Sequence, residues 1–159
     1  MSTRSYAPGL ASLTLLAAWL GAAVFVSAVI TPAAFAVLPT RALAGALVGR
    51  ALPILFLAGI LAGGVVVVMN QRMGATRLAT GGAVCFATAC AAALMVTFRL
   101  RAMLVTLGAP IETLDQADPR RRAFGHLHGA SVLLMGLGLI GACLALGMIA
   151  RQLNARSTA

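Results

Sequence analysis

The segment GASVLLMGLGLIGACLALGMIA, residues 129–150, contains no Asp, Glu, Lys, Arg or His, and segments of this kind decide the fold class. Three further uncharged apolar segments occupy residues 10–31, 51–69 and 78–98. Each is about 20 residues long, the length that a helix needs to cross a hydrocarbon core of about 30 Å. Lipid offers no hydrogen bonds to the backbone, so each segment must be helical. The sequence therefore predicts an all-α protein, a four-helix transmembrane bundle.

The composition excludes an ordinary water-soluble protein, because 61% of the 159 residues are hydrophobic and only 9% are charged. The four segments leave no room for a separate soluble domain, so we expect residues 1–159 to form a single integral membrane domain. Arg4 and the A-x-A pattern at residues 34–36 are compatible with a signal peptide. The first segment, however, exceeds the usual signal-peptide core of about 7–15 residues, and we expect an uncleaved helix.

The charge of the chain is strongly positive, with a formal net charge of +9 and 12 basic residues, all of them arginine. These arginines are scattered over the termini and the connections and form no continuous basic face, so we expect no nucleic-acid partner. Arginines in such places hold helix ends at lipid headgroups, which makes membrane lipid the expected partner. The exclusive use of arginine favours a GC-rich genome and hence the cytoplasmic (inner) membrane of a bacterium.

An even number of crossings places both termini on one side of the membrane. The arginines assigned to that side are Arg4, Arg72, Arg77, Arg151 and Arg156. Those assigned to the other side are Arg41, Arg50, Arg99, Arg101, Arg120, Arg121 and Arg122. Because positive charge favours the cytoplasmic side, we expect the first and third connections to be cytoplasmic.

Several residues predict where helices begin, end or bend. Pro32 should end or kink the first helix, and Pro53 should kink the second one turn into the membrane, because proline lacks a backbone N–H. Thr40 is expected to cap the start of the second helix, and Gly108 to end the third. Asp118, followed by proline, predicts the start of the fourth.

Close helix packing in lipid requires small residues, which occur at four-residue spacing on all four helices. Such pairs are Ala17/Gly21, Ala23/Ser27, Gly59/Gly63, Gly81/Cys85, Gly138/Ala142 and Gly141/Ala145. They favour one compact bundle, and a spare small-residue face would also permit a homo-oligomer. Trp19 lies near the middle of the first segment, where its indole needs a hydrogen-bond partner or packs against a neighbouring helix. We expect a packing role.

The two histidines, His126 and His128, are the first candidate functional residues. On a helix they point about 200° apart, so they cannot chelate one metal ion from one face. A bis-histidine haem would need histidines on separate helices. We expect His128 to hydrogen-bond into the bundle at the interface and His126 to face headgroups, with a structural role favoured over a functional one.

Arg50 and Arg99 are the second candidates, because they lie at the membrane boundary. An ionisable group within a membrane is a functional hypothesis by default, and the alternative is that Arg50 extends to a lipid phosphate. Arg50, Arg99 and His128 all border the first or third connection and therefore share one side. A cationic rim there can attract an anion or a lipid headgroup.

The sulfur-containing side chains are the third candidates, since thiols and thioethers are soft ligands for ions such as Cu(I). They are Cys85, Cys90, Cys143, Met95, Met103 and Met135. Cys85 and Cys90 lie about 140° apart around a helix, and no Cys-x-x-Cys or Met-x-x-Met pair is present. Packing is favoured, and we predict neither a metal site nor a cofactor.

Two sets of residues resemble one known family. The first is Trp19-Leu20-Gly21, Phe25, Pro32-Ala33-Ala34-Phe35, Leu38-Pro39, Gly45 and Arg50-Ala51-Leu52-Pro53, and the second is Phe124-Gly125-His126-Leu127-His128-Gly129-Ala130-Ser131. Their order and spacing are similar to those of the transmembrane-protein-205-like family, also called domain of unknown function 4149. The resemblance implies a four-helix membrane protein without an established activity, and eukaryotic members are associated with platinum-drug resistance.

The resemblance also extends to single positions. Arg50 matches the family's basic residue before proline, and His128 matches its His-Gly-x-Ser histidine. The family often has asparagine near the end of the third helix and early in the fourth, where this chain has Thr97 and Met135. A polar network that depends on those amides is therefore in doubt here.

Together these observations predict a non-enzymatic membrane protein that aids transport or tolerance of a small solute or metal. A membrane metal-binding or redox protein that uses Cys, Met and His is the first alternative. A purely structural or lipid-interacting bundle is the second. An enzyme acting on lipid is disfavoured, because the sequence shows no catalytic motif and no acid–base pair within the bilayer region.

Overall fold

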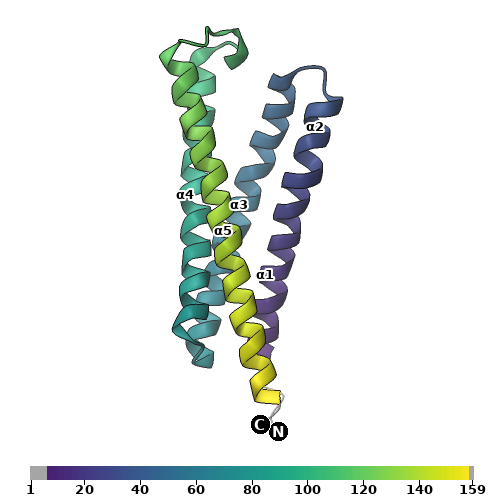
Figure 1. Cartoon of the computed structure of the whole chain (residues 1–159), viewed down its shortest axis with the longest axis vertical. Coiled ribbons are helices and arrows are strands. Elements are labelled where there is room, and N and C mark those ends of the chain that lie inside the picture. The colour runs from purple at the N-terminus through teal and green to yellow at the C-terminus, as the bar shows by residue number, and fades with distance from the viewer. Residues whose placement is uncertain (1–6, 158–159) are drawn as a thin grey trace.

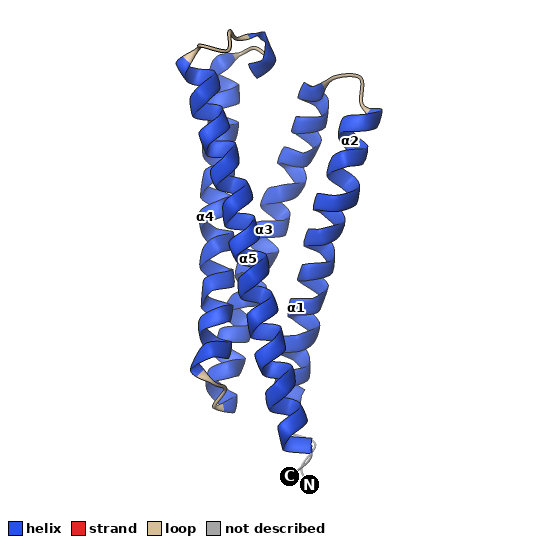
Figure 2. Ribbon diagram, viewed as in Figure 1, coloured by secondary structure: helices blue, strands red, loops and turns tan. Residues whose placement is uncertain are grey.

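A computed structural model describes residues 7–157, and within that range the chain is helical with no strand. Four helical stretches are each long and apolar enough to cross a membrane, which confirms the predicted all-α bundle (Figures 1 and 2). The elements are α1 (Ala7–Phe25), η2 (Val26–Ile30), α2 (Thr31–Val37), α3 (Arg41–Met73), α4 (Arg77–Leu107), η3 (Ile111–Thr113) and α5 (Pro119–Ser157).

The first helix does not end at Pro32, which was one of the two expected effects of this proline, because the chain stays helical through α1, η2 and α2. The π-helical segment η2 lies immediately before Thr31 and Pro32, and the Thr31 Oγ1 donates a hydrogen bond to the Val26 carbonyl at 2.9 Å. A wider π turn relieves the clash between a proline ring and the preceding turn. The helix therefore continues to Val37 rather than ending at residue 31.

The ends of the other helices follow local chemistry. Thr40 Oγ1 accepts a hydrogen bond from the Leu43 amide at 3.2 Å, which confirms the predicted cap of α3. The helix α3 then runs through Pro53 without interruption. Gly74 and Gly108 end α3 and α4 with φ of 62° and 63°, a left-handed conformation that glycine adopts without strain.

The helix α5 begins at Pro119, with Asp118 at its N-cap, as expected. The Asp118 Oδ1 accepts a hydrogen bond from the Arg120 amide at 2.8 Å. The Arg120 guanidinium also donates to both carboxylate oxygens, from Nε at 3.2 Å and from Nη2 at 2.8 Å. These bonds favour the ionised carboxylate, so the Arg120 side chain and then its amide lower the pKa of Asp118.

The lowered pKa of Asp118 predicts how the first turn of α5 responds to acid. A carboxyl whose pKa is lower in the folded state stabilises that state above its ordinary pKa. This contribution is lost as the pH falls through the lowered value. We expect the NMR resonance of the Arg120 amide to titrate with a midpoint below that of an ordinary aspartate. Asp118→Asn should abolish the titration, and a midpoint at or above the ordinary value would contradict the cap.

The core of the bundle lies toward the end where α1 begins and α5 ends. Trp19 of α1 is 5% exposed, and its Nε1 donates to the Leu55 carbonyl of α3 at 2.9 Å. Its ring meets Phe86 of α4 edge-on, with ring centroids 4.5 Å apart. Gly59 makes this contact possible, since a Cβ there would lie 2.7 Å from Trp19 Nε1. This cluster joins three helices.

The other end of the bundle is open. Two pairs of helices diverge toward the connections that follow α2 and α4 (Figure 1). One pair is α4 and α5, and the other is α3 and the helix formed by α1 and α2. The connection between α3 and α4 lies at the opposite end, near the described ends of α1 and α5. The fold therefore places the first and third connections together, as the sequence predicts for a chain with an even number of crossings.

Candidate functional site: a chamber at the open end

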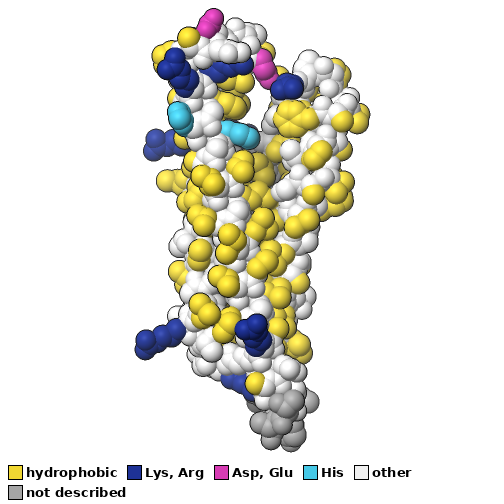
Figure 3. All heavy atoms as spheres, viewed as in Figure 1, with side chains coloured by type: hydrophobic (Ala, Val, Ile, Leu, Met, Phe, Trp, Pro, Cys, Tyr) yellow, Lys and Arg dark blue, Asp and Glu magenta, His cyan; other side chains and the backbone are white. Residues whose placement is uncertain are grey.

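A chamber of about 790 Å³ lies between α2, α3, α4 and α5 at the open end of the bundle. This volume is within the range of about 300–1,000 Å³ that is typical of small-molecule sites. Figure 3 shows the corresponding hollow, with acidic, basic and histidine side chains gathered around it. The chamber is thus the feature of the fold best suited to hold a ligand.

The walls of the chamber are mostly apolar. Phe35 of α2 and Leu52 of α3 line one side, and Leu100 of α4 and Met135 of α5 line the other. Gly45 and Gly49 of α3 also line it, and a Cβ at either position would meet no atom within 4 Å. The missing side chains at these two glycines therefore contribute directly to the open volume.

Charged side chains of both signs line the mouth of the chamber. Arg41 begins α3, Arg101 lies near the end of α4, and Glu112 belongs to η3. Among residues 7–157 the only ion pair joins Arg120 to Asp118, so these three charges are not neutralised by one another. Residues 108–112 all line the chamber, and the left-handed turn at Gly108 brings the Glu112 segment back over it.

Two hydroxyl groups lie deeper in the chamber, one helical turn or more inside the charged mouth. Thr97 is 4% exposed, and its Oγ1 donates to the Ala93 carbonyl at 2.8 Å. Ser131 of α5 is 7% exposed, and its hydroxyl has no hydrogen-bond partner in the described part of the chain. A buried hydroxyl of this kind is available to a ligand oxygen.

Of the polar candidates His126, His128, Arg50 and Arg99, only His128 lines the chamber. Its ring stacks on Phe124 with centroids 6.2 Å apart and an interplanar angle of 4°. The expected hydrogen bond from His128 into the bundle is not found among residues 7–157. His126, Arg50 and Arg99 are exposed and lie outside the lining.

Sequence reasoning missed Arg41, Arg101 and Glu112, although all three lie in or next to the first and third connections. Arg99 and Arg101 are two residues apart and therefore point to different faces of α4. Nothing in the sequence indicates whether Arg99 or Arg101 points into the chamber, because the residues around both are apolar.

The sulfur-containing residues do not come together. Cys90 is buried in the core, whereas Cys85 and Cys143 are exposed. Among residues 7–157 no three His, Cys, Asp or Glu side chains form a group able to hold a metal ion. Met135 lies on the chamber wall, where its Sδ accepts a hydrogen bond from the Ser27 hydroxyl at 3.9 Å.

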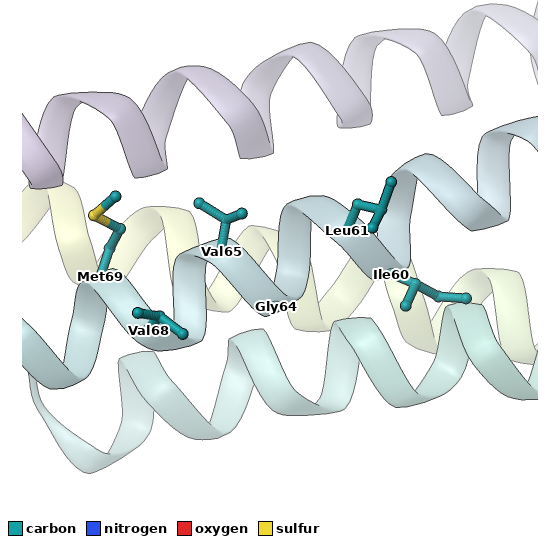
Figure 4. A pocket seen from close by; sticks show the side chains of 6 residues that line it. All are labelled: Ile60, Leu61, Gly64, Val65, Val68 and Met69. Carbon is teal, nitrogen blue, oxygen red and sulfur yellow. The ribbon is translucent and has the colours of Figure 1, made fainter.

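A second hollow, of about 380 Å³, is a shallow groove on the outer face of α3. Ile60, Leu61, Gly64, Val65, Val68 and Met69 line it (Figure 4). No charged or hydrogen-bonding side chain belongs to this lining. The groove faces outward from the bundle, where lipid tails would fill it.

The fold and the chamber define a class, the multi-pass helical membrane proteins, here with four crossings and an amphipathic cavity at one end. Within that class the chain belongs to the family described as Domain of unknown function (DUF4149), whose model matches residues 14–109. The match spans three of the four chamber walls, and α5 lies outside it. No curated protein and no solved structure matches the chain.

Proposed function

We propose that this protein is a non-enzymatic membrane protein whose chamber holds one amphiphilic solute, with the charged head at the mouth and the apolar part between the helices. The observation that carries this proposal is the lining itself, apolar along the helices and charged at one end. The protein would aid movement or tolerance of this solute at one face of the membrane.

The head group of the solute, rather than its alkyl chain, should contribute most of the binding free energy. Lipid tails are as apolar as leucine, so moving an alkyl chain from the bilayer into the chamber gains little free energy. The charged side chains of Arg41, Arg101 and Glu112 are exposed at the mouth and offer a head group partners that the hydrocarbon interior lacks. A ligand that satisfies Arg41 and Arg101 is therefore held mainly by its head group.

The resemblance to the transmembrane-protein-205-like group supports a role in handling a solute, given the association of its eukaryotic members with drug resistance. The abundance of arginine supports placing the protein in a bacterial cytoplasmic membrane. The chamber would then open toward the cytoplasmic leaflet, since the first and third connections carry more arginines.

Filling the chamber tests this proposal. We expect the double variant Gly45→Phe, Gly49→Phe to fold normally, because both positions face open space. Its retained lipid, measured by mass spectrometry after purification in detergent, should fall at least severalfold. Gly64→Phe is the matched control, since Gly64 lies on the same helix, faces open space and lines only the outer groove.

The wild type and the Gly64→Phe variant should retain the same amphiphile in similar amounts. Equal retention by all three proteins would overturn the proposal, because lipid would then be bound by the outer surface alone. The folded state of each variant is checked independently by its thermal unfolding midpoint in the same detergent.

A further inference from the structure

The charges at the chamber mouth identify the class of head group, given the proposed function. Arg41, Arg101 and Glu112 line one cavity, and none of them forms an ion pair with another residue among 7–157. A purely anionic ligand would satisfy the arginines but would place its charge near the Glu112 carboxylate. A purely cationic ligand would face two guanidinium groups. A zwitterion satisfies both signs.

We infer that the ligand is a zwitterionic phospho-amphiphile, with its phosphate on Arg41 and Arg101 and its ammonium group on Glu112. Guanidinium groups bind phosphate through several charge-assisted hydrogen bonds. The carboxylate accepts hydrogen bonds from a primary ammonium group. The aromatic pair of Phe124 and His128 lies in the same lining and offers a further surface for an ammonium group.

The deeper part of the chamber is suited to the glycerol and acyl parts of such a molecule. Ser131, a residue only 7% exposed, presents an unpartnered hydroxyl to the chamber at a level between the charged mouth and the apolar wall. An ester carbonyl or a glycerol hydroxyl stands at that level in a monoacyl glycerophospholipid. The lining of the chamber therefore follows the order of the groups in that molecule, from ammonium and phosphate through glycerol to the acyl chain.

Binding of chain-matched amphiphiles to the full-length protein in detergent tests the inference. The probes are a monoacyl glycerophosphoethanolamine, a monoacyl glycerophosphocholine, a monoacyl glycerophosphate and a fatty acid. Wild type should prefer a zwitterion over the monoacyl glycerophosphate by about tenfold, the usual scale for one charge-assisted hydrogen bond. Glu112→Gln should remove this preference by weakening zwitterion binding and strengthening that of the glycerophosphate.

Asp115→Asn is the matched control, because Asp115 lies in the same connection but does not line the chamber. It should leave the preference unchanged. Ser131→Ala should weaken binding of the three glycerol-bearing probes and leave the fatty acid unaffected. Water-soluble glycerophosphoethanolamine, which has no acyl chain, distinguishes a lipid from a free head group and should bind far more weakly.

The outcomes separate the two proposals. If the glycerophosphate binds as tightly as the zwitterions, and Glu112→Gln strengthens all of them alike, the zwitterion inference is wrong while the chamber still holds an amphiphile. If no acylated probe binds wild type more tightly than the Gly45→Phe, Gly49→Phe variant, the proposed function fails. Equal binding of the soluble and acylated head groups would also overturn the proposed function.

Discussion

Gly141→Leu is expected to separate α4 from α5 and to cause the largest loss of stability of any single substitution considered. A Cβ at Gly141 would lie 2.8 Å from the Phe86 amide nitrogen and 2.9 Å from the Gly82 carbonyl oxygen. Both are backbone atoms of α4, so no side-chain rotation relieves the clash. Overpacking of this kind costs about 3 kcal/mol or more, a large fraction of the stability of a typical fold.

The measurement is the unfolding of purified protein in mixed micelles, followed by circular dichroism as the denaturing detergent is increased. Gly147→Leu is the matched control on the same helix, because a Cβ at Gly147 meets no atom within 4 Å. The control should unfold like the wild type. Equal unfolding midpoints for the Gly141 and Gly147 variants would mean that α4 and α5 do not pack through this glycine.

Trp19→Ala is expected to produce the second large effect. The substitution removes a buried aromatic side chain that contacts Phe86 and donates to the Leu55 carbonyl. Truncating a buried aromatic residue costs about 3–5 kcal/mol, because a cavity remains where the ring was. Trp19→Phe keeps an aromatic ring but loses the hydrogen bond and part of the indole volume, so its cost should lie between about 1 kcal/mol and that of Trp19→Ala.

Phe25→Ala provides the comparison for Trp19→Ala, since Phe25 lies on the same helix and is 55% exposed toward the lipid side. Its truncation should change the free energy of unfolding far less. If the Trp19 and Phe25 variants lost the same stability, the three-helix cluster around Trp19 would not be the centre of the core.

The crossings and the helix ends were predictable because their causes are local. A crossing is identified by the length of its uncharged apolar segment. Thr40 and Asp118 cap the helices that follow them, and Gly108 ends the helix before it. The end of the helix at Pro32 was not borne out, because the effect of this proline depends on the turn before it, where Val26–Ile30 widens into a π-helix. Nothing in the sequence VSAVI marks that turn.

The faces of the helices were much harder to predict. Of the small-residue pairs, Gly59/Gly63 and Gly141/Ala145 are buried as expected, whereas Ala17 and Gly21 face outward. On α4 the close contact uses Gly82 rather than Gly81. A helix that is apolar all round has no polar side to mark its outer face, because lipid and core are equally apolar.

The same ambiguity limits prediction of the site. The sequence identifies the end of the bundle where cationic residues gather, and His128 among them lines the chamber. It does not distinguish Arg101 from Arg99, which lie two residues apart on one helix. That choice depends on the rotation of α4 against α5, which the contact between Gly82 and Gly141 fixes.

Photo-cross-linking tests the occupancy of the chamber most directly. A monoacyl glycerophosphoethanolamine with a diazirine in its acyl chain is irradiated with the wild-type protein in detergent, and the modified residues are mapped by mass spectrometry. Occupancy of the chamber predicts adducts concentrated on chamber-lining residues such as Leu52, Leu100 and Met135. Adducts spread equally over the chamber and over outer-groove residues such as Leu61 and Val65 would contradict it.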